Sequence, residues 1–217
     1  MADVLRLGDD DPVEIAERAT AALRRGQIVV LPTDTVYGLA ADAFHRPGVE
    51  RVFAAKQRDH SLPLPVMIRA PRQLEGLVTA VSDAAHRLMA AYWPGPLTIV
   101  VRHDPNLQWF LGDNRGTVGV RMPAEDVVLD VIRAVGPLAV TSANRSGQPA
   151  ATTVDEAMEQ LGDDVGLWID GGPRTDTSPS TIVDLTGDAP AILRAGPLDG
   201  DTVLGVATGE IDPLGAS

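Results

Sequence analysis

The sequence predicts an α/β protein, with a twisted mixed β-sheet and helices packed against it. Helical periodicity and short apolar, strand-like runs alternate along the whole chain, which is typical of sheets covered by helices. A length of 217 residues suits one such domain, and 44% hydrophobic with 22% charged residues is the composition of a folded globule. We therefore expect one domain over residues 1–196 and a short acidic tail over residues 197–217.

The first quarter of the chain predicts a helix, a buried strand, a polar turn and a second helix. Asp11 and Pro12 stand at the N-cap and first-turn positions, and Gly26 ends the first helix. The run QIVVLP indicates a buried strand. The segment PTDTVYGLAADA follows as a turn at its carboxyl end, where open α/β sheets hold their ligands. Residues 47–57 predict a short helix with Lys56 near its C-terminus.

Strands and helices continue to alternate through the rest of the chain. Ser82 caps a helix over SDAAHRLMAAYW, AEDVVLDVIRAVG predicts another, and Thr153 with Glu156 forms the capping box of a third. In the strand TVGVRMP, alternation places Thr117 and Arg121 on one face, which is either solvent or a pocket. The other predicted strands are PLPVMI, LTIVV, PLAVT, VGLWID, TIVDL and AILRAG.

Charge and cysteine content exclude several classes of function. The formal net charge is −12, and residues 151–217 carry 13 acidic side chains against 2 basic ones. With a pI of about 4.6 the chain lacks the basic character of phosphate-neutralising proteins, so we expect no stable nucleic-acid binding. The absence of cysteine excludes thiolate nucleophiles and cysteine-ligated metals. With no membrane-length apolar run and no basic signal peptide, we expect a cytoplasmic protein without membrane partners.

Lys56 is the only lysine in the chain, whereas the other 17 basic residues are arginine. Lysine and arginine are not interchangeable where a compact charge on a flexible stem is needed. A single lysine in such a chain is therefore a candidate functional residue. The alternative is that it was retained by chance on a solvated helix face.

Hydroxyl groups and isolated cations recur together in the predicted strand-end loops. Such groups stabilise phosphoryl charge, and a guanidinium also grips a carboxylate. No P-loop, GxGxxG or GxSxG motif is present, so the pattern favours transfer at a phosphate without a covalent enzyme intermediate. The groups are Thr33, Asp34 and Thr35; Lys56 and Arg58; Thr117 and Arg121; Ser142 and Asn144; and Ser178, Ser180 and Thr181 with Arg194.

Each group also has a purely structural interpretation. In that interpretation Thr33 and Thr35 only cap their turn, and Arg121 pairs with a nearby surface carboxylate. Ser142 and Asn144 would then satisfy backbone groups of their own loop. These residues alone predict an anion-binding α/β enzyme and leave the choice open.

Seven segments, in order, resemble one known family. They are LPTDTVYGLAADA, the K-x-R of Lys56-Gln57-Arg58 with LPLPVMI, YWPGPLTIVV, TVGVRMP, TSANRSGQPA, STIVDL and ILRAG. Together they resemble the YrdC-like threonylcarbamoyl-AMP synthases over roughly residues 12–196. The resemblance implies a YrdC-like single domain with a concave anion-binding face. It also implies the short form of the family, since 21 residues after Gly196 leave no room for the longer form's extra domain.

The resemblance implies a reaction as well. L-Threonine, bicarbonate and ATP would give threonylcarbamoyl-adenylate and pyrophosphate, for the t6A37 modification of tRNA. Mg²⁺ would accompany the ATP, and proteins that transfer the threonylcarbamoyl group to tRNA would be downstream partners. The protein itself would be a monomer or a homodimer.

Site roles follow from the same resemblance, position by position. Lys56 and Arg58 would be catalytic and would hold the triphosphate, and no residue is assigned to a metal. The nucleotide contacts would be Lys56, Arg58, Thr117, Asn144, Thr152 and Arg194. The L-threonine contacts would be Thr35, Arg121, Ser142 and Ser180, with Arg121 on the carboxylate.

Two positions depart from the family pattern, and three other functions were weighed. Asp59 stands where many members have proline, and Met67 where some have a histidine near the threonine. The alternatives are an RNA-binding module, the carbamoyl-adenylate chemistry of hydrogenase maturation, and a subunit that has lost activity. The negative charge argues against RNA binding, and the length and the absence of cysteine argue against the hydrogenase-maturation chemistry. The intact K-x-R and S-x-N residues argue against a subunit that has lost activity.

Overall fold

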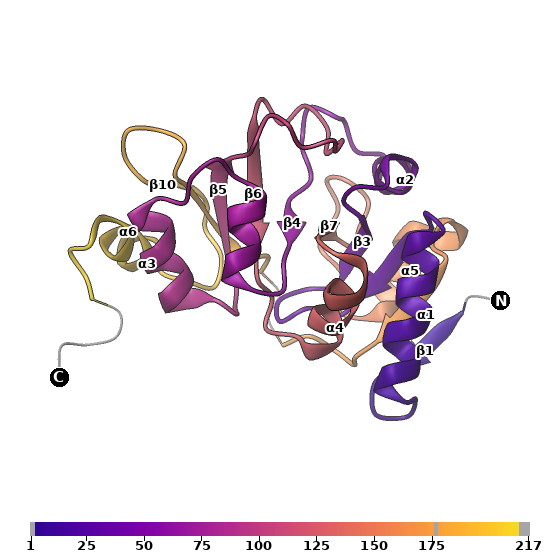
Figure 1. Ribbon diagram of the computed structural model, residues 1–217. Coiled ribbons are helices and arrows are strands. Elements are labelled where there is room, and N and C mark those ends of the chain that lie inside the picture. Colours follow the sequence, from indigo (N-terminus) through magenta and orange to yellow (C-terminus); the bar gives the residue numbers. More distant parts are fainter. Residues whose placement is uncertain (1–2, 176–177, 213–217) are drawn as a thin grey trace.

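The computed structural model describes residues 3–175 and 178–212, and its strands form one mixed sheet (Figure 1). The strand order is β1-β8-β2-β3-β7-β4-β6-β5-β9-β10. The predicted fold class, a mixed sheet with packed helices, is confirmed. The strands are β1 (Val4–Arg6), β2 (Val29–Leu31), β3 (Gly38–Asp42), β4 (Val66–Met67), β5 (Leu97–Arg102), β6 (Thr117–Arg121), β7 (Leu138–Ser142), β8 (Leu167–Asp170), β9 (Thr181–Asp184) and β10 (Ala191–Arg194).

Helices connect most of these strands. The α-helices are α1 (Pro12–Arg24), α2 (Arg46–Lys56), α3 (Asp83–Tyr92), α4 (Asp126–Val135), α5 (Val154–Leu161) and α6 (Gly200–Thr208). Two short 3-10 helices are η1 (Pro71–Gly76) and η2 (Gly162–Asp164). No helix within residues 3–175 and 178–212 has the length and apolar character that crossing a membrane requires.

The predicted helix starts are confirmed at atomic detail. The Asp11 carboxylate accepts from the Val13 amide at 2.9 Å, and the Ser82 hydroxyl accepts from the Ala85 amide at 3.2 Å. Thr153 and Glu156 form the predicted reciprocal capping box of α5. Each of these side chains satisfies backbone donors that the first turn of a helix leaves without a partner.

Two segments differ from the prediction. The stretch predicted as a turn after β2 contains the strand β3, which pairs antiparallel with β2 and with β7. The expected tail contains α6, whose residues Val203 and Val206 are fully buried. The acidic composition of this segment obscured a helix whose apolar side packs on α3 and the β9–β10 hairpin. Residues 213–217 of the expected tail lie outside the described residues.

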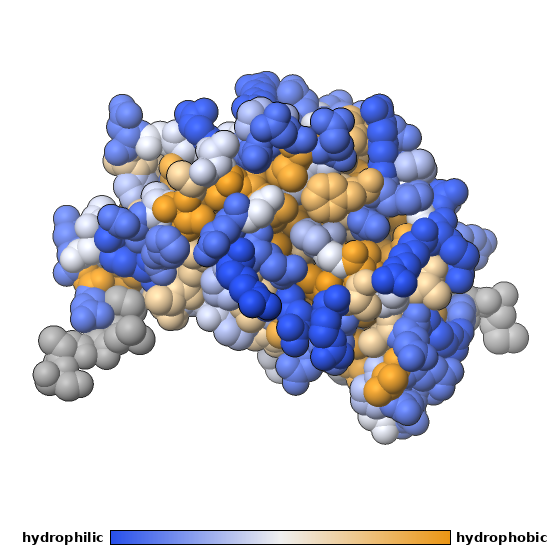
Figure 2. Space-filling view, in the orientation of Figure 1, coloured by the Kyte–Doolittle hydropathy of each residue, from blue (hydrophilic) through white to orange (hydrophobic). Residues whose placement is uncertain are grey.

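The sheet has an apolar core on each face, because its side chains alternate. On one face α1 and α4 pack over the β8, β2, β3 and β7 part of the sheet. On the other face the larger core joins α2, α3, α5 and α6 to the strands. Figure 2 shows apolar surface gathered in the upper centre, over the region where β4, β5 and β6 lie, whereas the α1 flank is mostly hydrophilic.

Candidate active site

A cavity of about 350 Å³ lies over the middle strands of the sheet, within the range of roughly 300–1,000 Å³ that small-molecule sites occupy. It adjoins the strands β3, β4, β5, β6, β7, β9 and β10, and Met67 and Val140 of its lining border the core that α1 and α4 cover. On β6 Thr117, Gly119 and Arg121 line the cavity as the alternation predicts, while Val118 and Val120 belong to the larger core. Val118 also borders the cavity, so only Val120 is wholly on the other side.

The structure brings most of the predicted site residues to this cavity. Those that line it are Thr35, Arg58, Thr117, Arg121, Ser142, Ser180 and Arg194. Lys56, Asn144 and Thr152 do not line it. These placements do not test the predicted roles, which stay predictions.

Arg121 lines the cavity and is almost fully buried. Its Nη2 pairs with Asp34 Oδ1 at 2.6 Å, Nη1 donates to Thr35 Oγ1 at 3.1 Å, and Nε donates to the Gly95 carbonyl at 3.0 Å. Burial lowers the pKa of Arg121, and the carboxylate of Asp34 opposes this shift. The structural alternative of a paired arginine is therefore correct in part, although the pair is buried and not on the surface.

Arg58 and Arg194 also line the cavity, and neither forms an ion pair with a described residue. Arg58 donates to the carbonyls of Leu62 and Pro63, at 2.8 and 3.2 Å. Arg194 donates to the carbonyl and hydroxyl of Ser180, at 2.7 and 3.0 Å. Burial lowers the pKa of both guanidinium groups, and the positive charges of Arg121 and Arg58 lower that of Arg194 further. Mutual repulsion of this kind favours binding of an anion.

Lys56 is buried beside the cavity and holds the loop that carries the S-x-N residues. Its Nζ donates to the carbonyls of Ser142 and Asn144, both at 2.5 Å, and to Asn144 Oδ1 at 3.3 Å. Burial, together with the nearby positive charge of Arg58, lowers the pKa of Lys56 to about 7. The side chain is 1% exposed, so the alternative of a solvated helix face is wrong.

Asn144 and Thr152 satisfy groups of their own loops. Asn144 Nδ2 donates to the carbonyls of Arg145 and Gln148, at 2.8 and 2.7 Å. Thr152 donates through its amide and its hydroxyl to Glu156, at 2.7 and 3.0 Å. The structural interpretation of Asn144 is thus confirmed, and both residues stabilise loops next to the cavity.

Thr33 caps its turn and also lines the cavity. Its hydroxyl donates to the Val36 carbonyl at 2.6 Å and accepts from the Thr35 amide at 3.2 Å, so it does cap the turn. It also lines the cavity. The capped turn fixes the position of the neighbouring Thr35 hydroxyl, which faces Arg121.

Sequence reasoning missed two hydroxyl groups of the cavity wall. Thr98 lies within the apolar run LTIVV, and its Oγ1 is 2.8 Å from Ser180 Oγ. Thr141 lies at the end of β7 beside Ser142 and also lines the cavity. The only available signal was a polar residue inside an apolar strand, which is informative because a buried hydroxyl needs a partner.

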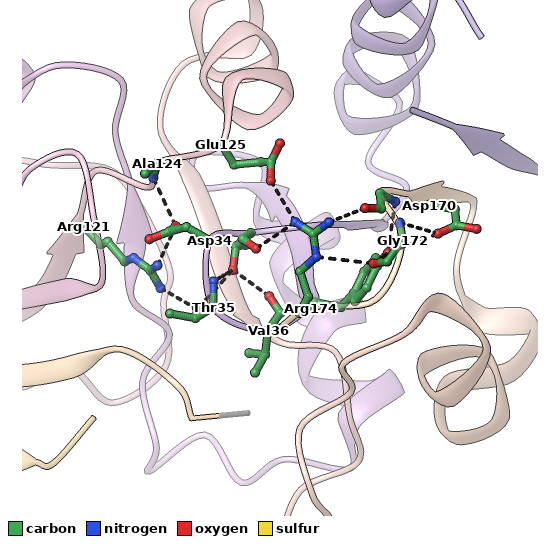
Figure 3. A network of polar contacts seen from close by, with 12 residues as sticks. Asp34, Thr35, Val36, Arg121, Ala124, Glu125, Asp170, Gly172 and Arg174 are labelled. Atoms are coloured by element: carbon green, nitrogen blue, oxygen red, sulfur yellow. Dashed lines mark hydrogen bonds and ion pairs between the residues drawn. The ribbon is translucent and has the colours of Figure 1, made fainter. Parts of the chain in front are cut away.

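A second polar network anchors the turn before β3 to the loop after β8 (Figure 3). Arg174 Nη1 donates to Glu125 Oε2 at 2.9 Å and to the Thr33 carbonyl at 3.3 Å. The Tyr37 hydroxyl donates to the Gly172 carbonyl at 2.8 Å, and burial raises the pKa of Tyr37 to about 12. Glu125 and Arg174 do not line the cavity, whereas their neighbours Thr33 and Tyr37 do. The network therefore supports the cavity wall from outside the lining.

The polar groups of the cavity suit anionic ligands. Its described lining holds three arginines and several hydroxyls, and no carboxylate. Nowhere in residues 3–175 and 178–212 do three or more histidine and carboxylate side chains gather as a metal site would require. Cations and hydroxyls in a concave, partly buried space can bind a carboxylate and phosphate groups together.

Comparison with known proteins agrees with this geometry. The family model Sua5_yciO_yrdC, described as "Telomere recombination", matches residues 21–196. A Mycobacterium leprae (strain TN) protein named "Putative threonylcarbamoyl-AMP synthase" is 51% identical over 180 residues, which is 83% of this chain and 82% of that protein. The threonylcarbamoyl-AMP synthase of Bacillus subtilis (strain 168) is 37% identical over 192 residues, 88% of this chain and 55% of that protein.

Two solved structures share the fold. Pyrococcus abyssi Sua5 complexed with L-threonine superposes with a TM-score of 0.88 at 34% identity, over 97% of this chain and 62% of that chain. This chain thus spans about three fifths of the P. abyssi protein. Escherichia coli YciO gives a TM-score of 0.80 at 26% identity, over 92% of this chain and 97% of that chain. From the matched residues and the shared sheet, we conclude that the chain belongs to the Sua5/YciO/YrdC family, which includes the threonylcarbamoyl-AMP synthases.

Proposed function

We propose that this protein is a threonylcarbamoyl-AMP synthase, which condenses L-threonine, bicarbonate and ATP to threonylcarbamoyl-adenylate and pyrophosphate. One observation carries the proposal: a single cavity holds both a buried, carboxylate-paired arginine and two arginines without an ion-pair partner among the described residues. The first is suited to an amino acid and the others to a triphosphate. The names of the relatives and the L-threonine complex of P. abyssi Sua5 support the same reaction.

The reaction needs positioning and charge neutralisation more than covalent catalysis. The amino group of threonine takes up CO₂ from bicarbonate, with loss of water, to give a carbamate. A carbamate oxygen then forms a bond to the α-phosphorus, and the bond from that phosphorus to pyrophosphate breaks in line. Holding the two reactants in one cavity supplies the orientation that this step requires.

The three arginines of the cavity, Thr35 and the adjacent Lys56 have distinct tasks in this proposal. Arg58 and Arg194 neutralise the phosphates and the charge that develops on the leaving pyrophosphate. Arg121 and Thr35 hold the carboxylate end of threonine. Lys56 keeps the loop of Ser142 and Asn144 in place, because all of its described hydrogen bonds go to that loop.

Mg²⁺ is proposed to enter with ATP. Since the described cavity lining contributes no carboxylate, the phosphates and water would supply most of its ligands, as is common for Mg²⁺ on nucleotides. Bound there, the ion would withdraw charge from the phosphates. The chain's own part is to bind the nucleotide through arginines and hydroxyl groups.

The product is a reactive mixed anhydride, so a second protein must transfer its threonylcarbamoyl group to tRNA. We propose that such transfer proteins are the downstream partners, that the enzyme works in the cytoplasm, and that it does not bind nucleic acid stably. The net charge of −12 supports the last point, because phosphate binding outside the cavity is disfavoured.

Pyrophosphate release from ATP tests the proposed function. The purified protein is assayed with Mg²⁺, with and without threonine and with and without bicarbonate. We expect release only when both are present, because the carbamate is the nucleophile. Release that continues without threonine, or that never occurs, would contradict the synthase reaction.

A further inference from the structure

The three arginines of the cavity differ in their partners, and Asp34 makes the difference. Asp34 pairs with Arg121, whereas Arg58 and Arg194 donate only to carbonyl and hydroxyl groups among the described residues. The side chains of Arg121 and Asp34 are 5% and 13% exposed, so water screens their interaction only weakly. Arg121 therefore carries its positive charge beside a negative one, although Asp34 itself does not line the cavity, whereas Arg58 and Arg194 present positive charge alone.

Asp34 is held rigidly in this arrangement. Its Oδ1 accepts from Arg121 Nη2 at 2.6 Å and from the Ala124 amide at 3.0 Å, and Figure 3 shows both donors directed at it. Its Oδ2 is buried and has no hydrogen-bond partner among the described residues. The negative charge of Asp34 is thus countered by Arg121 and by little else.

Arg121 keeps donors for a ligand. Of its five N–H groups, three are used by Asp34, Thr35 and the Gly95 carbonyl. Two N–H groups remain, one on each terminal nitrogen, and they can accommodate a carboxylate. The three partners come from two segments of the chain, the turn of Asp34 and Thr35 and the loop at Gly95, so they fix the orientation of the guanidinium.

We propose that Asp34 is the residue that makes Arg121 selective for an amino acid over a phosphate. An amino acid zwitterion has no net charge, so the nearby negative charge of Asp34 does not repel it as a whole. A phosphate carries only negative charge, so Asp34 repels it from Arg121 while nothing in the described lining repels it from Arg58 and Arg194. The inference rests on the proposed function, and it adds a residue that acts through Arg121 to keep phosphate away from the arginine that binds the amino acid.

The variant Asp34→Asn removes the negative charge of Asp34 and keeps the size and shape of its side chain. The amide oxygen of Asn can accept from Arg121 and from Ala124 as Oδ1 does, while the negative charge is lost. Glu125→Gln is the matched control, because Glu125 lies in the neighbouring network and pairs with Arg174, away from the cavity lining. Both variants are first compared with the wild type by thermal unfolding. If Asp34→Asn does not fold, Asp34→Ser removes the same charge.

The test is calorimetric titration with L-threonine in the presence of increasing inorganic phosphate, at constant ionic strength. In the wild type and in Glu125→Gln, we expect phosphate to leave the threonine affinity unchanged. In Asp34→Asn, phosphate should compete with threonine, with an affinity at Arg121 raised by about tenfold, as expected for removal of one nearby charge. The affinity for ATP should stay the same in all three proteins.

Three results would overturn the role of Asp34. These are competition by phosphate in the wild type, no competition in Asp34→Asn, or equal competition in Glu125→Gln. If the wild type does not bind threonine at all, the proposed function fails. The role of Asp34 is then tested by titration with phosphate alone. A second phosphate-binding event in Asp34→Asn that disappears in the double variant with Arg121→Ala would then still support the exclusion of phosphate by Asp34, and its absence would refute it.

Discussion

At the residue scale, the central finding is that the most conspicuous residue of the sequence does not line the cavity. Lys56 was predicted to hold the triphosphate, yet its ammonium group faces three oxygen atoms of residues 142 and 144. Lys56, at the C-terminal end of α2, holds the loop after β7 in place. Its predicted contact with the triphosphate stays a prediction. The compact ammonium group fits among these oxygen atoms, and a planar, forked guanidinium has a different shape.

The pH dependence of stability tests the environment of Lys56. Because its pKa is lowered to about 7 in the folded protein, the unfolded chain binds more protons between pH 7 and about 10.4, the ordinary pKa of lysine. The free energy of unfolding of the wild type, relative to Lys56→Met, should therefore rise with pH in this range. The slope should reach at most about 1.4 kcal/mol per pH unit.

Chemical denaturation of the two proteins at several pH values measures this difference. The comparison is clean because the chain has no other lysine. A difference that stays constant between pH 7 and 10 would show that the three oxygen atoms keep the ammonium group charged.

At the element scale, the helix α6 shows how composition can mislead. Residues 197–212 are acidic and contain three Gly residues and one Pro, which is typical of a tail. Asp199 nevertheless caps the helix by accepting from the Thr202 amide at 2.9 Å, and one side of α6 packs on α3. Arg87 of α3 also donates to the carbonyl of Val206 at 3.1 Å, near the end of α6. The segment is therefore part of the domain core up to this helix.

Val206→Ala should destabilise the protein if α6 is part of the core. Val206 is fully buried, and removing two methyl groups from a packed site costs about 1–3 kcal/mol. Val13→Ala is the matched control, because Val13 lies on α1 and is 63% exposed. We expect the control to be unchanged or slightly more stable, since alanine favours a helix. Urea denaturation of both variants measures the effect, and equal stabilities would mean that α6 contributes little.

At the scale of the whole molecule, the cavity joins elements that are far apart in the sequence. Its walls come from β3, β4, β5, β6, β7, β9 and β10, so a ligand that spans it ties most of the sheet together. Binding to the folded state alone stabilises a protein by mass action, by about 2.7 kcal/mol at a ligand concentration one hundred times Kd.

Thermal unfolding with ligands tests this view of the cavity. We expect ATP and threonine each to raise Tm, and both together to raise it more than either alone. In Arg121→Ala the shift caused by threonine should disappear while the shift caused by ATP persists, because only the first ligand depends on Arg121. Loss of both shifts in this variant would contradict the assignment of threonine to Arg121 and of ATP to Arg58 and Arg194.

The sequence by itself determined the features that depend on near neighbours. The caps at Asp11, Ser82 and Thr153 follow from side chains that reach backbone donors two or three residues away. The shared face of Thr117 and Arg121 follows from the two-residue period of a strand. With the motifs of the family, these local rules were sufficient for the fold class and for most of the polar residues that line the cavity.

Only the tertiary structure decided which charges meet. Asp34 and Arg121 are 87 positions apart, and Lys56 lies 88 positions from Asn144. Whether an arginine is neutralised or free depends on the order of strands in the sheet, which brings the turn before β3 to the end of β6 across β7 and β4. Local periodicity contains no information on that order. The difference between Arg121, which is paired with a carboxylate, and Arg58 and Arg194, which are not paired with a described carboxylate, is therefore a property of the folded sheet.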